Sequence, residues 1–186
     1  MNNQKTSKQL LAEWIAASDS TEYLSAENSN VEMATLSKLR LTEYSVMGCL
    51  LKDLGYILCK NQFIRILGGK NSVCKSFFEI NALYTGTSLL KDVLIIADTA
   101  NGGLFGLNCN QQNGATLGEV LYLPYSSFTW ERLDIGYSDF VRWVINVSET
   151  ELISGGWIEK PQREIQMSVR DTITYSKIDV LLSIKK

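Results

Sequence analysis

The stretch KDVLIIADTANGGLFGLN, residues 91–108, decides the fold. Residues 93–97 form an apolar run with hydrophobic side chains for both faces, which is typical of a strand at the centre of a sheet. The Asn101-Gly102-Gly103 segment supplies a turn, because Asn-Gly and Gly-Gly tolerate positive φ. Leu104 to Asn108 follows as the expected antiparallel partner. We therefore predict a β-hairpin at the middle of the chain.

Further strands are predicted on both sides of this hairpin. Residues 56–59 and 63–67 are apolar segments that flank a short polar turn, which predicts a second hairpin. Residues 118–123, ended by Pro124, and residues 128–133 predict two more strands. Ser138 is then expected to cap a helix. The apolar stripe of this helix consists of Phe140, Val141, Val144 and Ile145.

Helices are expected before the sheet. Ser7 can cap a first helix, residues 31–41 indicate a second, and residues 46–54 indicate a third with Gly55 at its C′ position. Residues 173–184 alternate only partly and indicate a strand or a short helix. This order predicts an α+β fold, with a mainly antiparallel sheet of about five to six strands. The length of 186 residues suits one domain, so residues 1–186 are expected to form a single domain.

Composition narrows the function classes. The chain has no histidine, which removes Ser-His-Asp and Cys-His nucleophile activation, HExxH zinc sites and Cys2His2 fingers. Eighteen basic and 20 acidic residues give a net charge of −2, without the basic surface that nucleic-acid phosphates require. Neither nucleic acid, a metal nor a cofactor is therefore expected as a ligand.

The cysteines and apolar segments indicate the compartment. The four cysteines, at positions 49, 59, 74 and 109, form no CxxC motif and are expected to be buried or half-buried free thiols. Glu13 interrupts the N-terminal apolar segment, whereas a signal peptide has an uninterrupted apolar region. No apolar run approaches the roughly 20 residues that span a bilayer. A cytoplasmic protein without membrane contact is expected.

Two glycine-containing segments resemble nucleotide motifs only partly. Gly68-Gly69-Lys70 lacks the full GxxxxGK[ST] pattern of a phosphate loop. Asp98 with the glycines at 102, 103 and 106 does not have GxGxxG spacing, and a strand rather than a helix follows. Both segments are better interpreted as turns in a sheet.

Charge is distributed unevenly along the chain. Residues 92–139 carry six acidic side chains and one basic side chain, whereas the flanking regions are slightly basic. Within this acidic block, the candidate partner-binding residues are Glu119, Glu131, Asp134 and Asp139. An acidic face can attract a basic protein and select among partners. The alternative interpretations are a solvated sheet edge and a carboxylate acid–base pair.

Three segments resemble the bacterial domain-of-unknown-function family 2625, which is similar to the SUKH superfamily of Smi/Knr-like proteins. They are GYILCKNQFIRIL from residue 55, VLIIADTANGGLFGLN, and GEVLYLPYSSFTWERLDIGYSDFVRWVI. Shared positions include Gly102-Gly103, Asn108, Trp130-Glu131 and residues 136–140. The resemblance covers about residues 45–147 well and the N-terminal helices loosely, and residues 148–186 depart from the family's usual aromatic-rich continuation.

This resemblance implies an α+β fold, protein binding and, in many superfamily members, immunity against a toxin. The matching residues are implied to determine the fold. They are Asn101, Gly102 and Gly103 in the turn, together with Trp130, Tyr137 and Phe140. We therefore expect a non-catalytic protein-binding module, with a basic toxin domain as one form of partner. A carboxylate- or tyrosine-based enzyme and a structural or regulatory subunit remain as alternatives.

Overall fold

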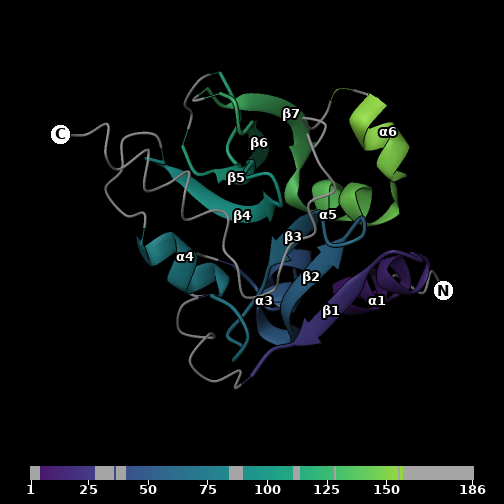
Figure 1. The fold of residues 1–186 in the computed structure, drawn as a ribbon. Helices are drawn as coiled ribbons and strands as arrows, with labels where there is room; N and C mark the ends of the chain where they lie inside the picture. Colours follow the sequence, from purple (N-terminus) through teal and green to yellow (C-terminus); the bar gives the residue numbers. More distant parts are fainter. Residues whose placement is uncertain are drawn as a thin grey trace.

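Seven antiparallel strands form one sheet in which each strand pairs with its neighbour in the sequence (Figure 1). The strands are β1 (Glu22–Ser25), β2 (Leu54–Cys59), β3 (Ile64–Leu67), β4 (Val93–Thr99), β5 (Leu104–Asn108), β6 (Glu119–Leu123) and β7 (Glu131–Gly136). The computed structural model describes residues 5–27, 36, 41–83, 90–110, 114–127, 129–154 and 156. The predicted antiparallel sheet and α+β class are confirmed, and β4 is the central strand. The sheet has seven strands rather than five to six.

Five helices accompany the sheet in the described part of the chain. They are α1 (Ser7–Ala16), α3 (Val46–Asp53), α4 (Phe77–Leu83), α5 (Tyr137–Asn146) and α6 (Glu149–Ser154). Within those residues, no helix combines the length and the apolar character needed to cross a membrane. The predicted helix over residues 31–41 falls almost wholly outside the described residues, and the segment 173–184 lies entirely outside them.

Three predicted helix boundaries are wrong. Thr6, not Ser7, caps α1, because its hydroxyl accepts from the Gln9 N–H in a capping box. Helix α5 begins at Tyr137, so Ser138 is inside the helix rather than its cap. Gly55 does not end α3 but lies within β2, where a Cβ atom would stand 2.9 Å from the Asn71 Cβ.

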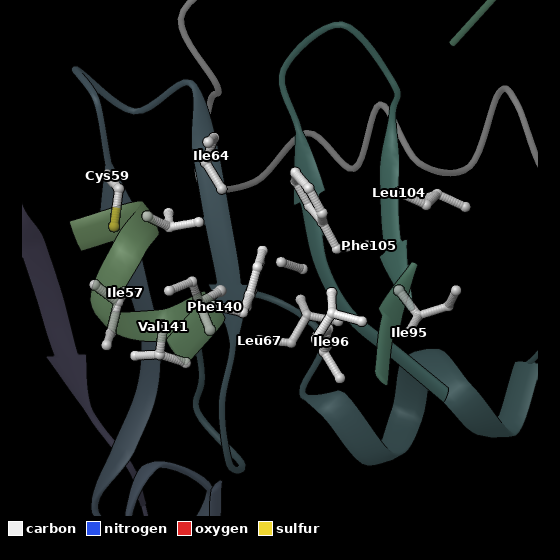
Figure 2. Packing of buried hydrophobic residues seen from close by; sticks show 14 of the residues in the cluster. Ile57, Cys59, Ile64, Leu67, Ile95, Ile96, Leu104, Phe105, Phe140 and Val141 are labelled. Atoms are coloured by element: carbon white, nitrogen blue, oxygen red, sulfur yellow. The ribbon is translucent and has the colours of Figure 1, made fainter. Parts of the chain in front are cut away.

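The first face of the sheet is an apolar row that runs across five strands. Register pairs Ile57 with Ile66, Ile66 with Ala97, Ala97 with Phe105, and Phe105 with Tyr122. Each of these residues is at most 2% exposed. Helix α5 packs on this row, with the Phe140 ring centroid 4.9 Å from that of Phe105, and Figure 2 shows Phe140 and Val141 among the buried hydrophobic residues. The prediction of Phe140 as a core residue is confirmed.

The second face carries a row that contains two charged residues. Register places Leu58 beside Arg65, Arg65 beside Asp98, Asp98 beside Leu104, and Leu104 beside Leu123. All five residues are buried, and Arg65 and Asp98 are 0% exposed. A buried ion pair thus lies between leucines at the centre of the sheet.

Helix α4 is attached to the central strand through one amide side chain. Asn81 Nδ2 donates to the Ile95 carbonyl at 2.9 Å, and the Ile95 N–H donates to Asn81 Oδ1 at 2.8 Å. Strand β3 pairs with β4 only at residues 97–99, so the amide of Asn81 pairs with the β4 backbone beyond that point. A seven-residue helix is marginal on its own, and this contact helps to explain its presence.

The turn between β2 and β3 has an unusual backbone. Lys60, Asn61 and Gln62 all have positive φ, between 52° and 67°, a conformation that costs non-glycine residues energy. Each side chain bonds to a different element: Lys60 Nζ to the Ile145 carbonyl at 2.8 Å, Asn61 to Glu149, and Gln62 to Glu22. These contacts hold the predicted hairpin turn in its strained form.

The turn between β4 and β5 depends on two glycines for different reasons. Gly102 has φ of 89°, which favours glycine. Gly103 does not have positive φ; instead, a Cβ atom there would stand 2.7 Å from Thr99 Oγ1 and 2.8 Å from the Tyr122 hydroxyl oxygen. The positive φ predicted for this turn is therefore confirmed at Gly102, whereas Gly103 is required by close approach.

We expect Gly103→Ala to lower the free energy of unfolding by about 1–3 kcal/mol, because the methyl group overpacks a closed site. Gly136→Ala is the matched control, since a Cβ atom there meets nothing within 4 Å and φ is −85°. Its change should be at most about 1 kcal/mol. Urea denaturation of both variants measures the difference. Equal stability of the two variants would contradict the conclusion that Gly103 is required by close packing.

Candidate functional site: the acidic edge of the sheet

Strand β7 forms one edge of the sheet. Among the described strands it pairs with β6 alone, through Tyr122 to Glu131, Leu121 to Arg132 and Glu119 to Gly136. The register shifts along this pair, and Asp134 has φ of 55°, as in a bulge. The strand buries Leu133 and exposes most of its other side chains. It begins at residue 131 rather than at the predicted residue 128, and Phe128 lies outside the described residues.

Glu119, one of the four candidate partner-binding residues, is buried. It is only 5% exposed, although it was predicted to be a partner-binding residue. Arg132 Nε donates to Glu119 Oε1 at 2.8 Å, and the Thr116 N–H donates to Oε2 at 2.8 Å. The hydrogen bond from Arg132 lowers the pKa of Glu119. This carboxylate therefore holds the β6–β7 pair together and is not available to a partner.

The other three candidates are exposed. We call Glu131, Asp134 and Asp139 the acidic edge. The Asp134 side chain is 73% exposed and accepts from Arg132 Nη2 at 2.6 Å. The Asp139 side chain is 65% exposed and lies 3.4 Å from Arg142, three residues later in α5. Two exposed arginines thus neutralise part of the charge that the sequence predicts for this surface.

Asp98, which belongs to the predicted acidic block, is buried and paired with Arg65. Arg65 Nε donates to Asp98 Oδ1 at 3.0 Å, and Arg65 Nη2 donates to Oδ2. Burial alone would lower the pKa of Arg65, but attraction to Asp98 outweighs it and raises that pKa. The third nitrogen, Nη1, is buried with no hydrogen-bond partner in the described part of the chain. Asp98 is therefore part of the sheet interior rather than of a nucleotide site.

Glycine and tryptophan residues of this region have packing roles. A Cβ atom on Gly106 would stand 2.9 Å from the Trp130 ring, so the glycine lets the ring lie against β5. Trp130 is 9% exposed, which confirms its predicted place in the core. Tyr137 is half-buried and packs against the core. Gly68 and Gly69 donate backbone hydrogen bonds to Gly55 and Leu54, so this segment is a loop held against β2 directly after β3.

The cysteines offer no nucleophilic pair. Cys49 and Cys59 are buried and Cys74 is half-buried, but Cys109 is exposed, contrary to the expectation for all four. Burial raises the pKa of Cys59 to about 12. Within the described residues, no three carboxylate or thiol side chains are grouped to hold a metal ion.

Sequence reasoning missed one cavity. It lies between the beginning of α1 and the end of α3 and has a volume of about 610 Å³. Three lysines and two carboxylates, Glu43 and Asp53, line it, together with Tyr44 and Cys49. The lysines are at positions 5, 8 and 52, so no local cluster in the sequence indicates the site. The detectable signal is Lys5 and Lys8 at the start of a helix that has no acidic residue in its first turn.

The Glu119–Arg132 pair predicts a pH dependence. Because the folded-state pKa of Glu119 lies below its ordinary value of 4.5, its ionisation stabilises the fold above about pH 4.5. That contribution is lost as pH falls through the folded-state pKa. Glu119→Gln should therefore destabilise the protein near pH 7, and the difference from wild type should shrink toward pH 3.

Thermal denaturation between pH 3 and 7 measures this effect. Glu131→Gln is the matched control, because it removes an exposed carboxylate that lies on the partner strand, and exposed changes shift stability by under about 0.5 kcal/mol. A constant difference between Glu119→Gln and wild type over this range would contradict the structural role of the carboxylate.

The similarity to known proteins extends beyond the three segments on which the family resemblance was based. The chain is 28% identical over 140 residues to an uncharacterised protein of Haemophilus influenzae, covering 73% of this chain and 60% of that protein. It is 27% identical over 184 residues to the uncharacterised protein YbfG of Escherichia coli K12, covering 94% of this chain and 81% of YbfG. No solved structure matches significantly. A family model described as "Protein of unknown function DUF2625" matches residues 1–172, and the chain therefore belongs to this family.

Proposed function

We propose that this chain is a non-catalytic protein-binding module whose acidic edge docks a basic protein. The observation that carries the proposal is the exposure of Glu131, Asp134 and Asp139 along one sheet edge and the adjoining helix turn. An edge strand also presents backbone groups to an incoming chain. Complementary charge would speed association and select the partner.

The more specific proposal is an immunity protein of the SUKH kind that neutralises a toxin. It rests on the sequence resemblance and on the α+β class that the resemblance implies. A toxin domain that acts on nucleic acid needs a basic surface for phosphate groups, which an acidic edge complements. Arg132 and Arg142 reduce the negative electrostatic potential of the acidic edge. We therefore propose that the edge guides the partner during association, while neighbouring apolar groups supply most of the affinity. Tyr125, which is 55% exposed after β6, is one such group.

The test is capture of partners from the native host with three baits. The first is wild type, and the second carries Glu131→Lys, Asp134→Lys and Asp139→Lys. The third is a control with the same change in net charge, Glu13→Lys, Asp19→Lys and Glu151→Lys, at exposed positions outside the acidic edge. We expect a basic protein to be retained by wild type and by the control, but weakly by the acidic-edge variant.

The association rate of the captured protein then tests the mechanism. Reversal of the acidic edge should slow association several-fold at low salt, and the effect should shrink as ionic strength rises. The control should associate like wild type. Equal rates for the acidic-edge variant and wild type would refute docking at this edge, and failure to retain any protein would refute the binding-module proposal.

A further inference from the structure

The cavity between α1 and α3 is built from a different set of residues than the acidic edge. One wall is the beginning of α1, with Lys8 in its first turn and Lys5 just before the Thr6 cap. The other wall is the last turn of α3 with Lys52, together with Tyr44 from the turn that precedes α3. Its volume of about 610 Å³ lies within the range of small-molecule sites.

The lysines line this cavity together with carboxylates, and Lys5 forms an ion pair with Glu13 at 2.7 Å outside it. Lys8 lies 2.8 Å from Asp53 and Lys52 lies 2.5 Å from Glu43, and these hydrogen bonds raise the pKa of both lysines. Both ammonium groups are therefore charged at neutral pH. Each ammonium group has three N–H donors, so donors remain after the ion pair is made. The Lys8 side chain is 73% exposed, which leaves these donors accessible.

An aromatic ring stands at the same cavity. Tyr44 is 79% exposed, the highest value among the large apolar and aromatic side chains of the described residues. A flat aromatic ring at this position can stack on a ligand base. Cys49 lines the cavity, but it is only 7% exposed, so little of its side chain is accessible to a ligand.

We propose that this cavity binds a small anionic ligand with a phosphate group and a flat aromatic ring, the chemistry of a mononucleotide. Lys8 and Lys52 bind the phosphate through the N–H donors that their ion pairs with Asp53 and Glu43 leave over, and Tyr44 stacks on the base. The site uses lysine ammonium groups in place of a glycine-rich phosphate loop. It shares no residue with the acidic edge, so the two sites fail or succeed independently.

Calorimetric titration of the full chain with AMP, GMP and UMP tests the proposal, with inorganic phosphate as the comparison ligand. We expect at least one mononucleotide to bind at least about tenfold more tightly than phosphate, because stacking adds to the ionic contacts. Lys8→Gln combined with Lys52→Gln should weaken binding by about tenfold or more, and Tyr44→Ala should weaken it by about tenfold. Lys91→Gln, an exposed lysine on the β4 side of the molecule, should bind like wild type.

Amine acetylation gives a second readout of the location. Bound mononucleotide should slow acetylation of Lys8, whereas the exposed Lys91 should react at an unchanged rate. Melting curves of all variants verify that they fold. The absence of binding at millimolar mononucleotide, or equal binding by wild type and the double lysine variant, would overturn the site. Inorganic phosphate binding as tightly as every mononucleotide would overturn the aromatic part of the ligand.

Discussion

The buried pair of Arg65 and Asp98 is the constraint on which the sheet depends. The two residues face each other across β3 and β4, with Leu58 and Leu104 on either side. A slip of one residue in either strand would turn a charged side chain toward the apolar face that α5 covers. Leaving either charge buried without its partner costs several kcal/mol, so the alternative registers are strongly disfavoured. The pair therefore fixes the centre of the sheet, and the strands on both sides follow from it.

Placement of the acidic edge is a consequence of this register. Since each strand pairs with its sequence neighbour, the position of β4 sets β5, then β6, and finally β7. Two glycines allow close packing along these strands: Gly103 leaves room for Tyr122, and Gly106 leaves room for Trp130. At the far end, Glu119 and Arg132 lock β7 in place and leave its remaining carboxylates facing outward. The Arg65–Asp98 and Glu119–Arg132 pairs are thus structural, whereas the remaining carboxylates of β7 and of the first turn of α5 stay at the surface.

Local patterns predicted the strong elements of the fold but not its long-range pairs. The apolar run at 93–97 and the turn chemistry around Gly102 carry their own signals, so the central hairpin was predictable. Strand β1 was missed because it is a four-residue edge strand with three exposed positions. Helix α4 was missed because Asn81 attaches it to a strand 14 residues away. For the same reason, charge counting could not show that Asp98 and Glu119 are neutralised by arginines 33 and 13 residues distant.

A double-mutant cycle on the central pair tests the account most directly. The free energy of unfolding is measured by urea denaturation for wild type, Arg65→Met, Asp98→Leu and the double variant. We predict a loss of about 3–5 kcal/mol for each single change, because each leaves one buried charge, and a much smaller loss for the double variant. Single losses below about 1 kcal/mol, or a double variant whose loss equals the sum of the two, would contradict the claim that this pair fixes the register of the sheet.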